Sequence, residues 1–182
     1  MAAHILSKPC SVSTTNRNGD LAPTSVEPNW EREKPCGREW KPGLFLLKSL
    51  RDYQRAKNPL TRGITTIRHR FWSAVAGCDI PLNSRIAGGL MIPHPIGIVI
   101  HPEAEIGANV LIFQQATIGA GGPVDGAPRI GSGVMIGAGA KILGGICIGK
   151  DARIGANAVV LSDIPEGATA VGIPAKIISC NY

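Results

Sequence analysis

Aliphatic residues recur at every sixth position through the second half of the chain. Six of the isoleucines are followed directly by glycine, and the full set on this period is Ile106, Ile112, Ile118, Ile130, Ile136, Ile142, Ile148, Ile154 and Val160. An α-helix repeats near 3.6 residues and a strand repeats at two, so neither alone produces a period of six. The pattern predicts a short strand and a tight turn, repeated, with the aliphatic side chain pointing inward. Three sixes would close a coil of eighteen residues, and successive coils would stack about 4.8 Å apart.

Two interruptions break this period. Ile80, Ile86, Ile92 and Ile98 form an earlier set of sixes, and the frame slips by two residues between Ile98 and Ile100, just after His94. The second interruption is AGGPVDGAP, residues 120–128, which separates Ile118 from Ile130. We interpret the slip as a place where the surface is not regular, and residues 120–128 as a loop extending from a corner.

Helical spacing precedes the repeat. Apolar residues at helical intervals predict two amphipathic helices within residues 43–76, which are separated by Asn58 and Pro59 and followed by a stop at Gly77; their apolar markers are Leu47, Leu50, Tyr53, Ile64, Ile67, Phe71 and Val75. Residues 1–42 are polar and lack a period, which predicts a flexible arm. We expect the coiled domain to cover residues 77–165 and a C-terminal extension to cover residues 166–182.

Composition and charge narrow the possible classes. The chain has 182 residues, few aromatic side chains and 23 glycines, which favours a repetitive β architecture. The formal net charge is +6, and the segment from Lys48 to Arg70 carries the excess, with Asp52 as its one acid. Such a segment suits a phosphate-bearing substrate, an anionic membrane or nucleic acid, although a solvated helix face is the more common explanation.

The cysteines and the first residues bear on the compartment. The five cysteines lack metal-ligand spacing and are odd in number, so we expect reduced thiols in a cytoplasmic protein; they are Cys10, Cys36, Cys78, Cys147 and Cys180. The first residues, MAAHILSKPCSV, have no pattern of a signal peptide. No apolar run approaches the roughly 20 residues that span a bilayer.

Several motifs resemble those of the hexapeptide-repeat acyltransferases, and most closely those of the serine acetyltransferase family. The strongest are HPIGIVIHPEAEIG, FQQATIG, GVMIGAGAKILGGICIG, ARIGANAVVLSDIP and VGIPAKI, within a resemblance that covers about residues 44–178. The resemblance implies a left-handed parallel β-helix with a short N-terminal α-helical segment. The handedness is carried by the resemblance alone, because general crossover rules would favour the right-handed form.

The same resemblance implies a mechanism and its residues. Acetyl-CoA would lie between two subunits of a homotrimer, and His94 would take the proton of an acceptor hydroxyl with Asp79 holding its other ring nitrogen. The alternative for His94, which lies between Pro93 and Pro95, is a corner residue stacked on proline. His101 is better interpreted as part of a structural turn.

The resemblance also assigns residues to the CoA side. Ala138 and Ala156 match small positions where the pantetheine arm approaches the backbone, and Gly119 is placed with them. Lys176 matches a basic position near the 3′-phosphate end of CoA. Small residues would equally suit any tight coil, and a solvated lysine is the alternative for Lys176. No metal is expected.

The acceptor side departs from the serine acetyltransferase pattern. Pro93 stands where that family has Asp, and Gly126 and Ala127 stand where it has an Arg-His pair. The chain therefore lacks the charged clamp for a free amino acid. We expect an O-acetyltransferase that acts on a sugar in surface-polysaccharide synthesis, with serine O-acetylation in cysteine biosynthesis as the runner-up. The short helical segment favours a single trimer, and its basic charge leaves weak association with an anionic membrane surface open.

Other classes fit less well. A zinc hydratase needs three convergent histidines, and the repeat supplies only His94 and His101. A nucleotide-sugar pyrophosphorylase needs a large nucleotide-binding domain before the repeats. We expect no nucleic-acid partner, and the remaining alternative is a non-catalytic β-helix scaffold.

Overall fold

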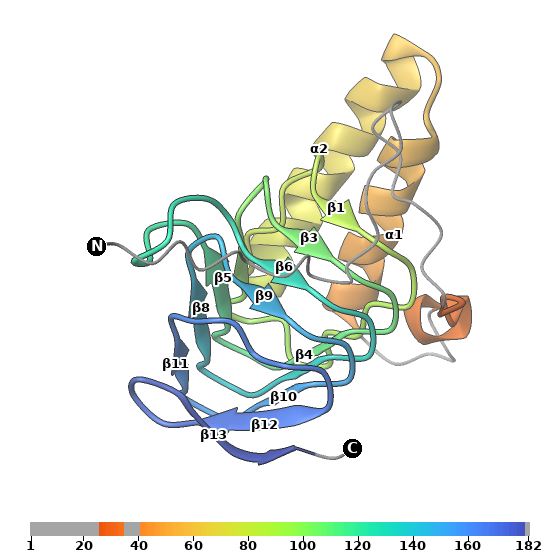
Figure 1. The fold of residues 1–182 in the computed structure, drawn as a ribbon. Coiled ribbons are helices and arrows are strands. Elements are labelled where there is room, and N and C mark those ends of the chain that lie inside the picture. Colours follow the sequence, from red (N-terminus) through yellow and green to blue (C-terminus); the bar gives the residue numbers. More distant parts are fainter. Residues whose placement is uncertain (1–25, 35–40, 181–182) are drawn as a thin grey trace.

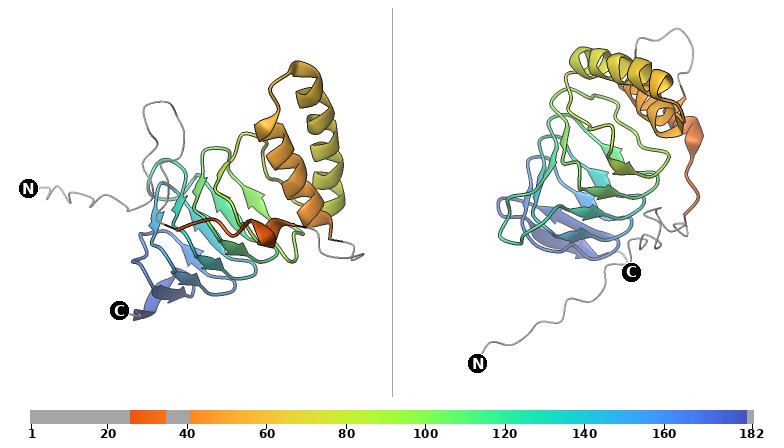
Figure 2. Two further views of the ribbon diagram at one scale, coloured as in Figure 1. Left: turned by 90° about the vertical axis from the view of Figure 1, so that its right-hand side faces the viewer. Right: turned by 90° about the horizontal axis from the view of Figure 1, so that it is seen from above.

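A coil of short parallel strands makes up most of the molecule, and two helices lie across the end where the chain enters it (Figures 1 and 2). The computed structural model describes residues 26–34 and 41–180. Each turn of the coil adds a strand to each of three sheets. The fold is therefore mainly β with parallel sheets and two helices, as the period of six predicted.

The three sheets run side by side along the coil. The first contains β1 (Arg85–Ile86), β3 (Glu105–Ile106), β6 (Arg129–Ile130) and β9 (Cys147–Ile148). The second contains β2 (Val99–Ile100), β5 (Thr117–Gly119), β8 (Lys141–Leu143) and β11 (Val159–Val160). The third contains β4 (Leu111–Ile112), β7 (Met135–Ile136), β10 (Arg153–Ile154), β12 (Ala168–Val171) and β13 (Lys176–Cys180), and β13 pairs antiparallel to β12. Because β12 still pairs in parallel with β10, the third sheet extends past the expected boundary at residue 165.

The aliphatic residues on the period of six form the core. All nine, from Ile106 to Val160, are at most 1% exposed, and the earlier set from Ile80 to Ile98 is buried as well. At the corners the next coil comes very close: a Cβ added to Gly137 would lie 2.6 Å from the backbone nitrogen of Ala156. Glycine is needed there because no side chain fits between the two backbones.

The two interruptions of the period both appear as longer corners. Val99 pairs with Thr117, eighteen residues later, which is the regular coil. Asp79 pairs with Val99, twenty residues later, and Thr117 pairs with Lys141, twenty-four residues later. The predicted slip is thus an insertion of two residues, and residues 120–128 contain no strand.

The helices begin and end close to the predicted positions. Helix α1 covers Pro42–Arg55, and α2 covers Pro59–Ala76. The side chain of Asn58 caps α2 by accepting a hydrogen bond of 2.8 Å from the N–H of Thr61. Gly77 ends the helix with φ +63°, a left-handed conformation that favours glycine.

A buried ion pair binds the described part of the N-terminal arm to the coil. The arm expected over residues 1–42 falls largely outside the described residues, but η1 (Trp30–Glu33) lies within them. The Glu33 carboxylate accepts two hydrogen bonds from Arg51 of α1, at 2.9 and 3.0 Å. Arg51 also donates to the carbonyls of Ile86 and Ala87 on the first coil, both at 2.7 Å. One guanidinium therefore joins the arm, α1 and the coil.

His69 connects α2 to the first coil in a similar way. Its ring is buried, with Nε2 2.8 Å from the carbonyl oxygen of Ile80 and Nδ1 3.0 Å from the hydroxyl of Ser49. A neutral ring satisfies both contacts by donating from Nε2 and accepting at Nδ1. Burial lowers the pKa of His69 below its ordinary 6.5, although the Ile80 carbonyl and the charge of Asp79 oppose that shift.

The lowered pKa of His69 predicts that the protein loses stability in mild acid. Below about pH 6.5 the unfolded chain binds a proton at this histidine that the folded chain resists, so the free energy of unfolding falls as the pH drops. His69→Gln keeps an N–H donor for Ile80 but does not titrate. Its free energy of unfolding, measured by urea denaturation at about pH 7.5 and about pH 5.5, should fall less over this interval than that of the wild type. Equal losses in the two proteins would contradict the assignment.

Candidate active site

The two-residue insertion places His94 on an enlarged corner between the third and second sheets. The chain takes eight residues from Met91 to Val99, where the next coil takes six from Leu111 to Thr117. The corner is fixed at its end, because the N–H of Gly97 donates to the carbonyl of Gly77 at 2.6 Å. His94 itself is exposed, so its ring is available to a ligand rather than to the core.

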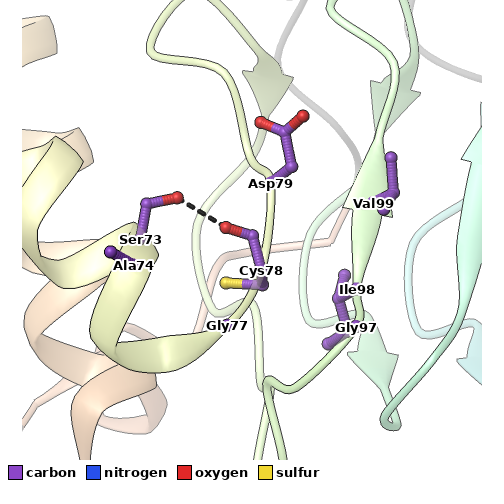
Figure 3. A pocket seen from close by; sticks show the side chains of 8 residues that line it. All are labelled: Ser73, Ala74, Gly77, Cys78, Asp79, Gly97, Ile98 and Val99. Carbon is purple, nitrogen blue, oxygen red and sulfur yellow. Dashed lines mark hydrogen bonds between the residues drawn. The ribbon is translucent and has the colours of Figure 1, made fainter.

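Asp79 lies on the strand position next to β2. Its N–H donates to the Ile98 carbonyl at 2.8 Å, and its carbonyl accepts from the N–H of Ile100 at 2.9 Å. Its carboxylate is exposed beside a pocket of about 340 Å³ between the end of α2 and β2, where the Ser73 hydroxyl donates to the Cys78 carbonyl (Figure 3). The pocket is lined by Ser73, Ala74, Gly77, Cys78, Asp79, Gly97, Ile98 and Val99.

The predicted catalytic residues therefore approach β2 from two sides. His94 is on the corner that leads into the strand, and Asp79 pairs with its first residue, Val99. Within the single chain described, no hydrogen bond or ion pair joins the two side chains. An exposed base and an exposed carboxylate beside the same strand can serve proton transfer to or from a bound hydroxyl.

Asp79 is the only charged side chain among the eight that line the pocket. No lysine or arginine of that lining is available to hold an anionic group. Within the part of the chain that the structure describes, no group of His, Cys, Asp and Glu residues is arranged to hold a metal ion. The pocket thus offers an acid, backbone groups and apolar surface.

The residues predicted to contact CoA lie on two edges of the coil. Ala138 and Ala156 lie on later coils, at the same corner as His94. The N–H of Gln115 donates to the carbonyl of Ile96 at this corner, and the N–H of Asn157 donates to the carbonyl of Ala138 at the equivalent position. Gly119 ends β5 at the other edge of the second sheet, and Lys176 begins β13 and is exposed. At this corner the N–H groups of Ala138 and Ala156 have no hydrogen-bond partner within the described residues, so they can donate to a ligand.

The loop at residues 120–128 packs against the next coil. A Cβ added to Gly145 would lie 2.3 Å from the Asp125 carbonyl oxygen, and the Gly145 N–H donates to the Val124 carbonyl at 2.9 Å. Ala127 packs against the core from this loop. The positions of the Arg-His pair in the resembled family are therefore filled here by small residues on a closely packed loop.

Gln114, a polar residue that we did not predict, lies at the corner shared with Ala138 and Ala156. Its side-chain oxygen is buried and has no hydrogen-bond partner among the residues that the structure describes. Gln114 lies one coil beyond the corner that carries His94. A buried carbonyl oxygen without a donor is costly unless a ligand or water supplies one. The sequence held only a weak signal for this residue: Gln114 and Gln115 are adjacent at a corner, where small residues are usual.

His101 lies in the turn before β3. Its Nδ1 accepts a hydrogen bond from the N–H of Glu103 at 3.3 Å, and its carbonyl accepts one from the N–H of Ala104 at 3.0 Å. This is the structural turn that the sequence predicted for His101.

The Cys78 thiol beside Asp79 is held in its protonated form. Burial, together with the negative charge of Asp79, raises the pKa of Cys78 to about 12. A protonated thiol is a poor nucleophile. An acyl group is therefore not expected to pass through Cys78, and a transfer at this site would go directly from donor to acceptor.

This pKa predicts that native Cys78 resists alkylation. At about pH 8 only about one thiol in ten thousand would be ionised, so labelling should be about a thousandfold slower than in the denatured protein. The measurement is the rate of iodoacetamide labelling of the peptide that contains Cys78, by mass spectrometry. Comparable rates in the native and denatured protein would show that the thiol is accessible and ionised.

Residues 127–162 match the family profile described as bacterial transferase hexapeptide (six repeats). No curated protein matches the chain.

Solved structures of serine acetyltransferases are similar to the chain. One described in complex with CoA is 40% identical, with a TM-score of 0.66, over 76% of this chain and 58% of that one. The enzyme from Vibrio cholerae O1 biovar El Tor N16961 is 36% identical (TM-score 0.67; 79% and 56% covered). The soybean enzyme complexed with serine is 38% identical (TM-score 0.65; 75% and 57% covered).

The match covers less than two thirds of each of these relatives, so the chain spans only part of their length. Within that span the sequence repeat and the fold agree. The chain carries the hexapeptide repeat of the bacterial transferases on a fold similar to that of the serine acetyltransferases.

Proposed function

We propose that the protein transfers an acetyl group from acetyl-CoA to a hydroxyl of a small acceptor. The observation that carries this proposal is the two-residue insertion in the corner that leads into β2: it carries the exposed His94, and the exposed Asp79 pairs with Val99, the first residue of that strand. The similarity to serine acetyltransferases, one of them bound to CoA, supports acetyl-CoA as the donor.

The reaction needs a group that removes the proton of the acceptor hydroxyl and then gives a proton to the departing thiolate. A ring nitrogen of His94 accepts the proton of the acceptor hydroxyl while that oxygen attacks the thioester carbonyl. Backbone N–H groups stabilise the tetrahedral oxyanion. When this intermediate collapses, the carbon–sulfur bond breaks and the imidazolium returns its proton to the departing thiolate. Asp79 orients the imidazole and stabilises its charged form.

The donor would lie along the corner that His94, Ala138 and Ala156 share. The free N–H groups of Ala138 and Ala156 suit the amide carbonyls of the pantetheine arm, and coils about 4.8 Å apart match an extended chain. Gly119 would leave room for the arm at the other edge of the second sheet. The Lys176 ammonium would serve the 3′-phosphate end of CoA.

In this proposal the coil is left-handed and three copies of the chain form a homotrimer. Ile96 and Val99 are exposed apolar residues beside His94 and Asp79. A neighbouring subunit would cover them and close the site against water, which strengthens the electrostatic contacts inside it.

The acceptor we favour is an uncharged sugar hydroxyl. A free amino acid needs a cation for its carboxylate and an acid for its ammonium group, but Pro93, Gly126 and Ala127 supply neither. The pocket beside Asp79 is also lined by no cation. A sugar, as in surface-polysaccharide synthesis, needs only hydrogen bonds and an apolar surface.

L-serine is the second candidate. Solved serine acetyltransferases from soybean and Neisseria gonorrhoeae are described in complex with serine and are 38% and 36% identical to this chain. Serine would have to be held by groups other than the missing clamp.

A thiol-release assay with acetyl-CoA distinguishes these acceptors. We expect turnover with members of a panel of sugars and nucleotide-sugars, and turnover with L-serine no greater than the background hydrolysis of acetyl-CoA. Turnover with L-serine and none with the sugars would overturn the sugar proposal and leave acetyl transfer intact. Failure to bind CoA in a calorimetric titration would instead favour a non-catalytic scaffold.

In the same assay His94→Ala should lower the rate by at least about a hundredfold, because it removes the general base. His101→Ala is the matched control and should retain the rate within about twofold, since His101 lies in a turn. Retention of the full rate by His94→Ala would refute the mechanism.

A further inference from the structure

Helix α2 buries two polar residues against the protein and exposes four of its large apolar residues to solvent. Thr65 and His69 are buried, and both are satisfied: the Thr65 hydroxyl donates to the Thr61 carbonyl at 2.8 Å, and His69 bonds to Ser49 and Ile80. A surface helix ordinarily has the opposite orientation. Both side chains can be buried at this interface because each has a hydrogen-bond partner.

The outward face of α2 carries a continuous apolar stripe. The exposed fractions are 74% for Leu60, 57% for Ile64, 73% for Ile67 and 59% for Phe71. These residues are spaced by four, three and four positions and so lie on one side of the helix; Val75 continues the line. We call Leu60, Ile64, Ile67 and Phe71 the α2 stripe. A contiguous exposed patch of this kind marks an interaction surface.

The charges beside the α2 stripe are all positive. The helix contains no Asp or Glu. At helical spacing Arg68 and Arg70 lie on either side of the stripe. Arg70 is exposed and has no ion-pair partner among the described residues, and Arg68 is paired with Asp52 of α1. The surface is therefore apolar along its middle and cationic at its sides, which is the pattern of helices that lie in a membrane interface.

A second copy of this chain fits the α2 stripe poorly. The helix of 18 residues is about 27 Å long and about 10 Å wide, so it offers roughly 270 Å² against the roughly 800 Å² per partner of a stable interface. Self-pairing is also symmetric, and it would bring Arg70 near its own copy with no carboxylate on α2 to offset the charge.

We propose that α2 binds the surface of an anionic lipid bilayer. The α2 stripe lies at the boundary between headgroups and acyl chains, and Arg70 contacts a lipid phosphate. Both helices are at one end of the coil and β13 is at the other (Figure 2), so the coil extends away from the membrane. This inference concerns binding alone and does not depend on the acetyl-transfer reaction.

Vesicle flotation with the full chain tests the proposal. Wild-type protein should bind vesicles of phosphatidylcholine mixed with phosphatidylglycerol at least about tenfold more tightly than vesicles of phosphatidylcholine alone. Added salt should weaken the binding, because salt screens the arginine contacts.

Two variants separate the apolar and electrostatic contributions. The double variant Ile64→Gln and Ile67→Gln should lower binding to the anionic vesicles by at least about tenfold, because it removes the apolar contacts. Arg70→Gln should lower it by about fivefold, since one basic residue contributes that much at such a surface. Ile178→Gln is the matched control, because Ile178 is equally exposed on β13 at the far end of the coil, and it should bind as the wild type does.

Absence of wild-type binding to the anionic vesicles would overturn the proposal, as would full binding by the double variant. Light scattering in solution tests the alternative, in which the stripe pairs copies of the chain. If the wild type forms a larger assembly that the double variant abolishes, and neither binds vesicles, the stripe is an interface between copies of the chain. Circular dichroism of each variant confirms that the changes at these exposed positions leave the fold intact.

Discussion

The backbone ladder between successive coils is the constraint on which the rest of the structure depends. Strands donate to and accept from the coils on both sides: the Val99 N–H donates to the Ala116 carbonyl of the next coil, and the Ile100 N–H donates to the Asp79 carbonyl of the previous one. The positions of paired residues are therefore fixed along all three sheets. Isoleucine fills the space inside, and glycine at the corners allows the next backbone to approach within van der Waals contact. A coil held in this way has no room for an additional residue in a strand. Extra residues must leave the coil at a corner.

Both irregular features follow from this constraint, and both bear on the proposed function. Two extra residues enlarge the corner that carries His94, and six extra residues form the loop at residues 120–128. In each case the strands on either side remain paired in register. The coil thus supplies a rigid frame, and the proposed chemistry lies where the frame is interrupted. Asp79 depends on the same frame, because its pairing with Val99 sets it beside that corner.

Much of this arrangement is predictable from sequence because it is local and periodic. The inward isoleucines, the slip at His94, the loop and the ends of the helices at Asn58 and Gly77 all follow from spacing and turn residues. The sequence does not reveal which side of α2 faces the protein, because an apolar stripe is usually buried. Here the polar contacts of His69 with Ser49 and Ile80 decide the orientation, and they join segments far apart in the chain. The Glu33–Arg51 pair is a contact of the same kind. The unpartnered oxygen of Gln114 and the raised pKa of Cys78 depend on burial, which spacing along the chain does not reveal.

In the proposed mechanism the thioester of acetyl-CoA meets its acceptor at the corner enlarged at His94. A crystal structure of the protein with CoA would show whether it does. We predict that the pantetheine arm follows the corner through Ala156 and Ala138 and that the CoA sulfur lies beside the His94 ring. A CoA molecule bound elsewhere on the coil, or one whose sulfur lies away from His94, would contradict it.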